Sequence, residues 1–493
     1  MLSSTELINR SGRVTMIGLD FGSTTSSAMM ATALVGLSSA TGRMELGSPR
    51  VVYRSDPVFT PFDGERIDSI CLNDHIDRWI RESGIAEKTF FAGGVIITGL
   101  AARQANAVEI VKLIGDRIGE AVIATADDPC LESWLAFMGS CSTLSRYHCR
   151  IPFINLDIGG GTTNPAFGID GDVRHTGCYF VGARHFRFNP GTYRLIGLSS
   201  YGRALLNALG IKKQIGQDFE TDETGAILSF YIAALEAIAQ GNVEFFSSPI
   251  AGRYQQIPFA FESGGKKPAI VFSGGVGELV YRESQGKGLP GTTYYGDLGI
   301  DLARLIVRSP ILSGHIMDLI PENQGRATVY GLTLHSMEIS GQTIFLSSND
   351  ILPCRSFPIV ARLPIDADAE QLRKAVLMVE STARGGCIQV LPGTTQGSES
   401  MKVRENPADN ALEKVKTFGQ RLRHVCTQVM LKQPIVVLVS ENYGLVLGNY
   451  ASNWRQEPFN FVVIDEIPDR QAHFVNIGRL QNTIVPVSFY GVC

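Results

Sequence analysis

The fold is decided by the stretch Ile17-Gly18-Leu19-Asp20-Phe21-Gly22-Ser23-Thr24-Thr25 and by its later counterpart, Ile154-Asn155-Leu156-Asp157-Ile158-Gly159-Gly160-Gly161-Thr162-Thr163. In both stretches an apolar strand ends in aspartate, a glycine turn follows, and hydroxyl residues lead into another strand. Glycine has no Cβ, so its backbone can turn tightly and come close to a ligand. Successive free N–H groups in such a turn form a concave anion site, and Ser and Thr hydroxyls add further donors. Both stretches are therefore interpreted as phosphate-binding loops.

Two such hairpins that face each other would hold a polyphosphate from both sides. We expect Asp20 and Asp157 to be the catalytic and Mg²⁺-directed carboxylates, because Mg²⁺ keeps several waters and uses few carboxylates. One loop alone is equally consistent with an ordinary β-hairpin, but a second copy with a triple glycine disfavours that interpretation. The expected phosphate contacts are Gly22, Ser23, Thr24, Gly159, Gly160, Gly161, Thr162 and Thr163.

A third motif follows the two loops in the chain and reads Ala269-Ile270-Val271-Phe272-Ser273-Gly274-Gly275-Val276-Gly277-Glu278. A buried strand runs here into a double glycine and then into a helix. The motif resembles the adenosine loop of the actin, sugar-kinase and chaperone ATPase superfamily, which implies that the nucleotide contacts Gly274, Gly275, Gly277 and Glu278. The sequence contains no G-x-x-x-x-G-K-[ST] and no G-x-G-x-x-G after a strand, which excludes a P-loop protein and a Rossmann dehydrogenase.

Strand-like and helix-like segments alternate along the chain, which indicates an α/β protein. With the three motifs in this order, we expect a two-lobed actin-like ATPase fold, ribonuclease H-like in each lobe, with a nucleotide cleft and a C-terminal α/β region. The expected boundaries are 1–150 for the first lobe, 151–310 for the second lobe with the adenosine loop, and 311–493 for the C-terminal region. Within the last part, the pattern predicts a strand at 327–330 and a long helix at 411–431.

Other segments resemble further elements of the superfamily. The resemblance of Asp128-Pro129 to the acidic-Pro element of chaperone-type members implies a catalytic carboxylate that reaches metal-bound water. Asp-Pro before a helix is also a routine helix start, and Glu132, one turn into the helix, is the alternative. Residues 95–107 and 296–303 resemble the two connecting helices that cross at the base of the cleft.

Composition excludes several classes of function. The 493 residues carry a formal net charge of −4, so there is no bulk reason to bind nucleic acid or an anionic membrane. Nine unpatterned cysteines favour reduced thiols in a cytosolic compartment, and no cysteine or histidine spacing indicates a metal site. No apolar run approaches the roughly 18 residues that a membrane span needs.

Along nearly its whole length the chain closely resembles the reactivating factors of ethanolamine ammonia-lyase. Beyond the nucleotide motifs, the resemblance rests on Asp56-Pro57-Val58-Phe59-Thr60-Pro61, Ser247-Ser248-Pro249, Arg326-Ala327-Thr328-Val329-Tyr330-Gly331, Val463-Ile464-Asp465-Glu466 and Ile484-Val485-Pro486-Val487. Leu100 and Asn442 depart from the family pattern, each standing where an acidic residue is usual.

The resemblance implies an ATP- and Mg²⁺-dependent factor that releases damaged cobalamin from inactivated ethanolamine ammonia-lyase, so that adenosylcobalamin can enter again. It implies a cytoplasmic or microcompartment-associated location and leaves the oligomeric state open. Two alternatives remain. A small-molecule kinase of the sugar-kinase branch would need a catalytic aspartate in a substrate pocket. A nucleotide-binding actin-like scaffold would assemble with negligible turnover.

Overall fold

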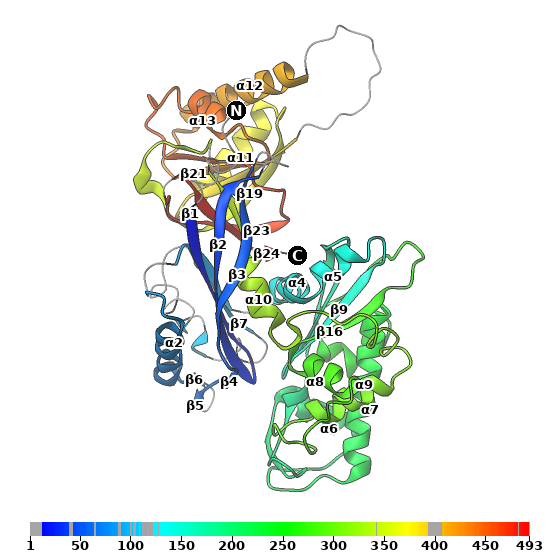
Figure 1. The fold of residues 1–493 in the computed structure, drawn as a ribbon. Coiled ribbons are helices and arrows are strands. Elements are labelled where there is room, and N and C mark those ends of the chain that lie inside the picture. The colour runs from blue at the N-terminus through cyan, green and yellow to red at the C-terminus, as the bar shows by residue number, and fades with distance from the viewer. Residues whose placement is uncertain are drawn as a thin grey trace.

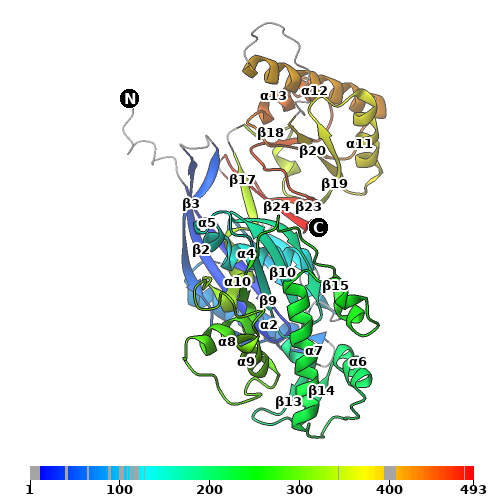
Figure 2. The same ribbon diagram turned by 90° about the vertical axis from the view of Figure 1, so that its right-hand side faces the viewer.

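The structure is a computed structural model that describes residues 12–38, 43–63, 66–86, 90–98, 101, 105–107, 109–110, 114, 122–126, 128–341, 343–392, 407–481 and 483–492. Figure 1 shows two lobes side by side and a third part, formed by the C-terminal residues, at the end of β1–β3. Figure 2 gives the same arrangement from the side, with the C-terminal part far from helices α8 and α9 of the second lobe. None of the described helices is long and apolar enough to cross a bilayer.

The sheet of the first lobe has the strand order β3-β2-β1-β7-β8, with β4 paired to β2. β1 and β2 form the predicted antiparallel hairpin, while β7 and β8 continue the sheet in parallel on the other side of β1. Helix α2 covers this sheet with Leu72, Ile76 and Trp79, and the Trp79 ring stacks on Phe21 at the end of β1. The bounds are β1 Gly12–Phe21, β2 Thr25–Leu37, β3 Met44–Arg54, β4 Val58–Phe59, β5 Phe62–Asp63, β6 Arg66–Ile67, α2 Ser69–Ser83, β7 Ala92–Ile97 and β8 Val122–Ala126.

The sheet of the second lobe repeats this plan in the order β15-β12-β10-β9-β16. β9 and β10 form the second predicted hairpin, and β16 runs parallel to β9. The adenosine-loop prediction of a strand followed by a helix is confirmed by β16 and α8. The bounds are β9 Phe153–Ile158, β10 Thr163–Ile169, β11 Asp172–Thr176, β12 Cys178–Tyr179, β13 Phe186–Phe188, β14 Leu195–Leu198, α6 Ser200–Leu209, α7 Thr221–Ala239, β15 Gln255–Ile257, β16 Ala269–Ser273, α8 Gly274–Ser284 and α9 Gly299–Arg308.

Two short helices, α4 (Pro129–Ser140) and α10 (Ala327–Leu334), pack tightly against each other between the lobes. Their backbones approach through glycine: a Cβ on Gly139 would lie 2.0 Å from the Ala327 oxygen, and one on Gly331 would lie 2.1 Å from the Leu135 oxygen. Helix α10 also packs on β1, β2 and β7, and α4 packs on β10. These two helices therefore join the sheets of the two lobes. Helix α5 (Ser142–Tyr147) follows α4.

Two predictions fail at this junction. Residues 327–330 are helical and not a strand. The helix is buried on most sides, so its sequence is apolar all round and shows no helical periodicity from which a helix could be predicted. Helix α9 packs on α7 and α8 inside the second lobe, so residues 296–303 do not form a connecting helix between lobes. Much of 95–107, including Gly99 and Leu100, lies outside the described residues.

The C-terminal part is built on an eight-stranded sheet of order β17-β24-β23-β19-β20-β21-β22-β18. Strands β19 to β22 are parallel, and α11, α12 and α13 connect them in turn. The three helices share one buried cluster with these strands, including Val376, Phe418 and Leu447. The bounds are β17 Met337–Ser340, β18 Phe345–Leu346, β19 Cys354–Pro364, α11 Ala369–Ser381, β20 Gly386–Leu391, α12 Pro407–Val429, β21 Ile435–Val439, α13 Gly444–Ala451, β22 Phe461–Ile464, β23 Ala472–Ile477 and β24 Val485–Val492.

Candidate nucleotide site between the two lobes

A cavity of about 450 Å³ is lined by residues of both lobes. The loop between β1 and β2 and the loop between β9 and β10 both contribute to its wall, together with the first residues of α8 and α10. The predicted site residues that line it are Asp20, Gly22, Ser23, Thr24, Asp157, Gly159, Gly160, Gly161, Thr162, Gly274, Gly275 and Glu278. Segments that are far apart in the sequence thus meet around a single space of a size suited to a small ligand.

The first loop is a closed turn held by the segment that follows β4. The Gly22 N–H donates to the Thr25 oxygen at 2.9 Å, which closes the turn. The Thr60 hydroxyl donates to the Gly22 oxygen at 2.6 Å, and the Thr60 N–H donates to the Thr24 oxygen at 3.0 Å. The Thr24 Oγ1 is buried and has no hydrogen-bond partner within the described part of the chain, which leaves a polar atom for a ligand to satisfy.

The second loop has the same closing bond, from the Gly159 N–H to the Thr162 oxygen at 2.9 Å. The N–H groups of Ala183 and Arg184 donate to the oxygens of Gly159 and Gly160, at 3.2 Å and 2.6 Å, and hold the loop from the far side. A Cβ on Gly160 would lie 2.2 Å from the Thr24 Oγ1. The two loops therefore approach each other so closely that a Cβ at this position would displace the Thr24 hydroxyl.

The surroundings of Asp20 and Asp157 disfavour the ionised form of both carboxyl groups. Burial raises the pKa of Asp20 to about 7, with a further contribution from the charge of Asp157, and the Thr98 hydroxyl at 3.3 Å partly offsets the shift. Burial raises the pKa of Asp157 to about 6, although the Ser273 hydroxyl donates to its Oδ1 at 2.6 Å. Asp157 is buried and Asp20 is partly exposed, and neither carboxylate has an ion-pair partner among the described residues. A divalent cation would stabilise the ionised form of both, so this donor set fits Mg²⁺.

Asp128 and Thr163 do not line the cavity, whereas Glu132, the alternative to Asp128, does. Asp128 does not line the cavity: its Oδ1 accepts from the Leu131 N–H at 3.0 Å as the N-cap of α4, and its Oδ2 accepts from the Gly491 N–H at 2.7 Å. Glu132, the alternative one turn further along, is buried and does line the cavity. The Thr163 hydroxyl donates to the Val181 oxygen at 2.6 Å and points away from the cavity.

Gly277 and Asn442 do not line the cavity and have contacts elsewhere in the structure. Gly277 packs on β16, where a Cβ would lie 3.0 Å from the carbonyl carbon of Phe272. Asn442 is hydrogen-bonded to Thr343 in the C-terminal part and is not among the cavity-lining residues, so its departure from the family pattern does not bear on the metal ligands.

Several cavity residues were not anticipated from the sequence. Arg282 and Arg326 bring positive charge to the wall, and Asp297 forms an ion pair with Arg184 at 3.6 Å. The Arg184 guanidinium lies over the ring of Phe59, 5.8 Å from its centre, and this contact joins the second lobe to the first. These side chains come from segments without a shared motif, so only the tertiary structure could bring them together.

In each lobe a β-hairpin with a glycine turn and an aspartate lies beside a strand that runs parallel to its first strand, β2-β1-β7 in one lobe and β10-β9-β16 in the other, and both turns border one cavity. This arrangement defines the actin-like ATPase class of fold. Within that class, the chain belongs to the family described as ethanolamine utilisation protein EutA, whose model matches residues 12–491. Two curated relatives are each named "Ethanolamine ammonia-lyase reactivase EutA". The one from Salmonella typhimurium is 27% identical over 491 residues, and the one from Escherichia coli is 27% identical over 490 residues. Both alignments cover 96% of this chain and 97% of the relative.

Solved structures with distant similarity include a Ppx/GppA family member from Aquifex aeolicus and MreB 5 of Spiroplasma citri bound to AMPPNP. The first is 13% identical, covering 65% of this chain and 88% of that chain, with a TM-score of 0.30. The second is 15% identical, covering 60% and 96%, with a TM-score of 0.27.

Proposed function

We propose that this protein is an ATP-dependent reactivating factor that releases damaged cobalamin from inactivated ethanolamine ammonia-lyase, so that adenosylcobalamin can bind again. The observation that carries the proposal is the pairing of two glycine loops and two carboxylates around one interlobe cavity. The family, and the printed names of the two curated relatives, support ethanolamine ammonia-lyase as the partner.

In this proposal the cavity binds ATP with Mg²⁺. Asp20 and Asp157 hold the metal, whose charge would neutralise the phosphates, and the backbone N–H groups of the two loops orient the phosphate oxygens. Gly274, Gly275 and Glu278 border the nucleoside. The buried Glu132 is suited to orient a water, because it lines the same cavity from the start of a different helix. The Thr24 hydroxyl, which has no hydrogen-bond partner among the described residues, supports a phosphate contact at the first loop.

Nucleotide state would change the spacing of the two lobes. Each lobe supplies one loop to the cavity. Helices α4 and α10 join the lobes and are closely packed at their glycine contacts. A ligand that touches both loops favours the closed arrangement, and closure would alter the affinity for the lyase. We place the first lobe at 1–150, the second at 151–310 and the C-terminal region at 311–493. A cytoplasmic or microcompartment-associated location follows from the partner, and the proposed role requires neither nucleic acid nor a membrane.

The test is reactivation of ethanolamine ammonia-lyase that has been inactivated with tightly bound hydroxocobalamin. The lyase is incubated with this protein, ATP, Mg²⁺ and fresh adenosylcobalamin, and the recovery of deamination is followed. We expect recovery with the wild-type chain, none without ATP, and none with Asp157→Asn. The matched control is Asp172→Asn, an exposed aspartate of the same lobe paired with Arg174, which should reactivate normally.

Absence of recovery, with ATP still bound, would contradict the proposal. Phosphorylation of a small molecule in a substrate screen would then indicate a kinase. Filaments or stable complexes with negligible turnover would indicate an actin-like scaffold.

A further inference from the structure

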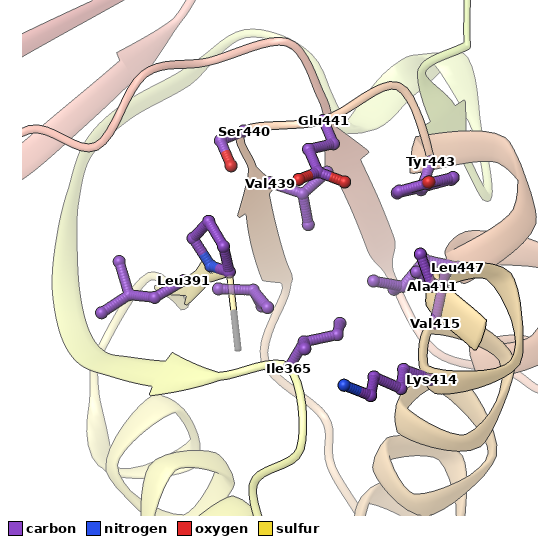
Figure 3. A pocket seen from close by; sticks show the side chains of 12 residues that line it. Ile365, Leu391, Ala411, Lys414, Val415, Val439, Ser440, Glu441, Tyr443 and Leu447 are labelled. Atoms are coloured by element: carbon purple, nitrogen blue, oxygen red, sulfur yellow. The ribbon is translucent and has the colours of Figure 1, made fainter. Parts of the chain in front are cut away.

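A second cavity, of about 320 Å³, lies in the C-terminal part and shares no lining residue with the interlobe cavity. Figure 3 shows it at the ends of parallel strands. Ile365 follows the carboxyl end of β19, Leu391 ends β20 and Val439 ends β21. The carboxyl ends of parallel strands are the edge at which α/β sheets bind their ligands. The position and the volume both suit a small-molecule site.

The base of this cavity is apolar and firmly packed. Val390 and Val439 come from the sheet, and Val415 and Leu447 come from α12 and α13. All four side chains are buried in the cluster that holds the three helices on the sheet. A ligand on this base would meet a preformed apolar surface and not a flexible one.

Opposite charges stand on two sides of the apolar base. In Figure 3 the Glu441 carboxylate points into the cavity from the loop after β21, and the Lys414 ammonium points in from α12 on the other side. Within the part of the chain that the structure describes, neither group has an ion-pair partner. By contrast Glu413 and Lys416, on the same helix, pair with each other at 3.5 Å. The hydroxyls of Ser440 and Tyr443 also border the cavity.

We propose that this cavity binds a small zwitterion whose ammonium group meets Glu441, whose acidic group meets Lys414, and whose short alkyl body lies on the apolar base. Glu441 and Lys414 are both exposed, so a ligand with a single charge would gain one charge-assisted contact where the zwitterion gains two. Because Figure 3 shows Glu441 and Lys414 on different sides of the cavity, the two charges of the ligand lie at its two ends. The site is independent of the nucleotide cavity.

The test is isothermal titration calorimetry of the full chain with 4-aminobutanoate and 6-aminohexanoate, and with butylamine and butanoate as single-charge comparisons. We expect at least one zwitterion to bind saturably at a single site, and the single-charge compounds to bind at least about tenfold more weakly. Absence of saturable binding by every zwitterion would overturn the proposal. Equal binding of zwitterions and single-charge compounds would do the same.

Two pairs of variants locate the binding. Glu441→Gln and Lys414→Met should each weaken the best zwitterion at least about tenfold, since each removes one charge-assisted contact. Glu413→Gln and Lys416→Met make the same changes of charge outside the cavity and should leave the affinity unchanged. An equal loss in all four variants, or no loss in the first pair, would contradict the assignment. Thermal unfolding of each variant verifies that the fold is kept, and both cavity charges are exposed and free of internal ion pairs in the described chain.

Discussion

The two phosphate loops have the same turn but hold their aspartates differently. Asp157 is buried and receives a hydrogen bond of 2.6 Å from Ser273, which in turn accepts from Asn155 at 2.9 Å. Asp20 is partly exposed, and among the described residues its hydrogen-bond donor is Thr98 at 3.3 Å. The pKa of Asp20 is raised further than that of Asp157, to about 7 against about 6, because the charge of Asp157 adds to the effect of burial. The second loop therefore holds a fixed carboxylate, and the first holds one that depends more on an added cation.

This difference shows that the two copies of a duplicated motif can have different roles. Two residues, Ser273 and Asn155, fix Asp157 before any ligand arrives, so it can set the position of a metal. Asp20 gains most from the metal, because its ionised form is the less favoured of the two in the ligand-free protein.

The largest effect is expected where the two loops touch. Gly160→Ala would place a Cβ 2.2 Å from the Thr24 Oγ1 and force the loops apart. We expect ATP affinity to fall about 100-fold, or about 3 kcal/mol, which is the upper range for overpacking. Equilibrium dialysis with labelled ATP measures this change. Gly225→Ala in α7, where a Cβ meets nothing within 4 Å, is the matched control and should bind normally. Unchanged affinity in Gly160→Ala would contradict the loop contact.

The next effect concerns the pH dependence of stability. The folded-state pKa of Asp20 is raised from 3.8 to about 7, so the folded protein retains a proton that the unfolded chain releases. Stability of the ligand-free protein should therefore fall as pH rises from about 4 to about 7. Asn at position 20 removes this cost, and Asp20→Asn should raise the free energy of unfolding at pH 8 by about 2 kcal/mol. Urea unfolding at pH 4 and pH 8 measures it. An equal change at both values of pH would rule out this origin.

A smaller effect separates the two hydrogen bonds to the carboxylates. Ser273→Ala removes the stronger bond, so the pKa of Asp157 rises, and the pH at which Mg²⁺–ATP binding reaches half its maximum should rise by about one unit. Thr98→Val removes the longer bond to Asp20 and should produce a smaller rise. Binding isotherms from pH 5 to pH 9 give both midpoints. A larger shift for Thr98→Val would reverse the contrast between the two loops.

The smallest effect is expected at the contact between Phe59 and Arg184. Phe59→Leu keeps an apolar side chain but removes the ring beneath the guanidinium. A cation–π contact at a partly exposed site contributes about 0.5–1 kcal/mol, so ATP affinity should fall about threefold. The same dialysis assay detects this change. A loss comparable to that of Gly160→Ala would indicate that Phe59 has another role in closing the lobes.

The loops were predictable because their signal is local. A glycine turn between an aspartate and hydroxyl residues needs few tertiary contacts to define its shape, and the predicted hairpins and the β16–α8 turn are all present. Helix α10 was mistaken for a strand, because a short run with Thr, Val and Tyr has the composition of a strand, and only burial against β1 and α4 decides between the two.

The acidic residue that α4 presents to the interlobe cavity was predictable only to within one turn. Asp-Pro correctly indicated the start of α4, but the side chain of Asp128 is used by the helix N-terminus and by Gly491, while Glu132 faces the cavity. Arg282, Arg326 and Asp297 had no sequence signal, since their relation to the loops exists only in the folded chain.

The most direct test of the central claim is the Mg²⁺ dependence of ATP binding, measured by calorimetry at pH 8 for the wild-type chain, Asp20→Asn and Asp157→Asn. If the two loops hold one Mg²⁺–ATP between them, the wild-type chain binds ATP much more tightly with Mg²⁺ than without, and both variants lose that difference. Either variant that retains the wild-type affinity and its full Mg²⁺ dependence would contradict the claim that the two carboxylates share one metal in the interlobe cavity.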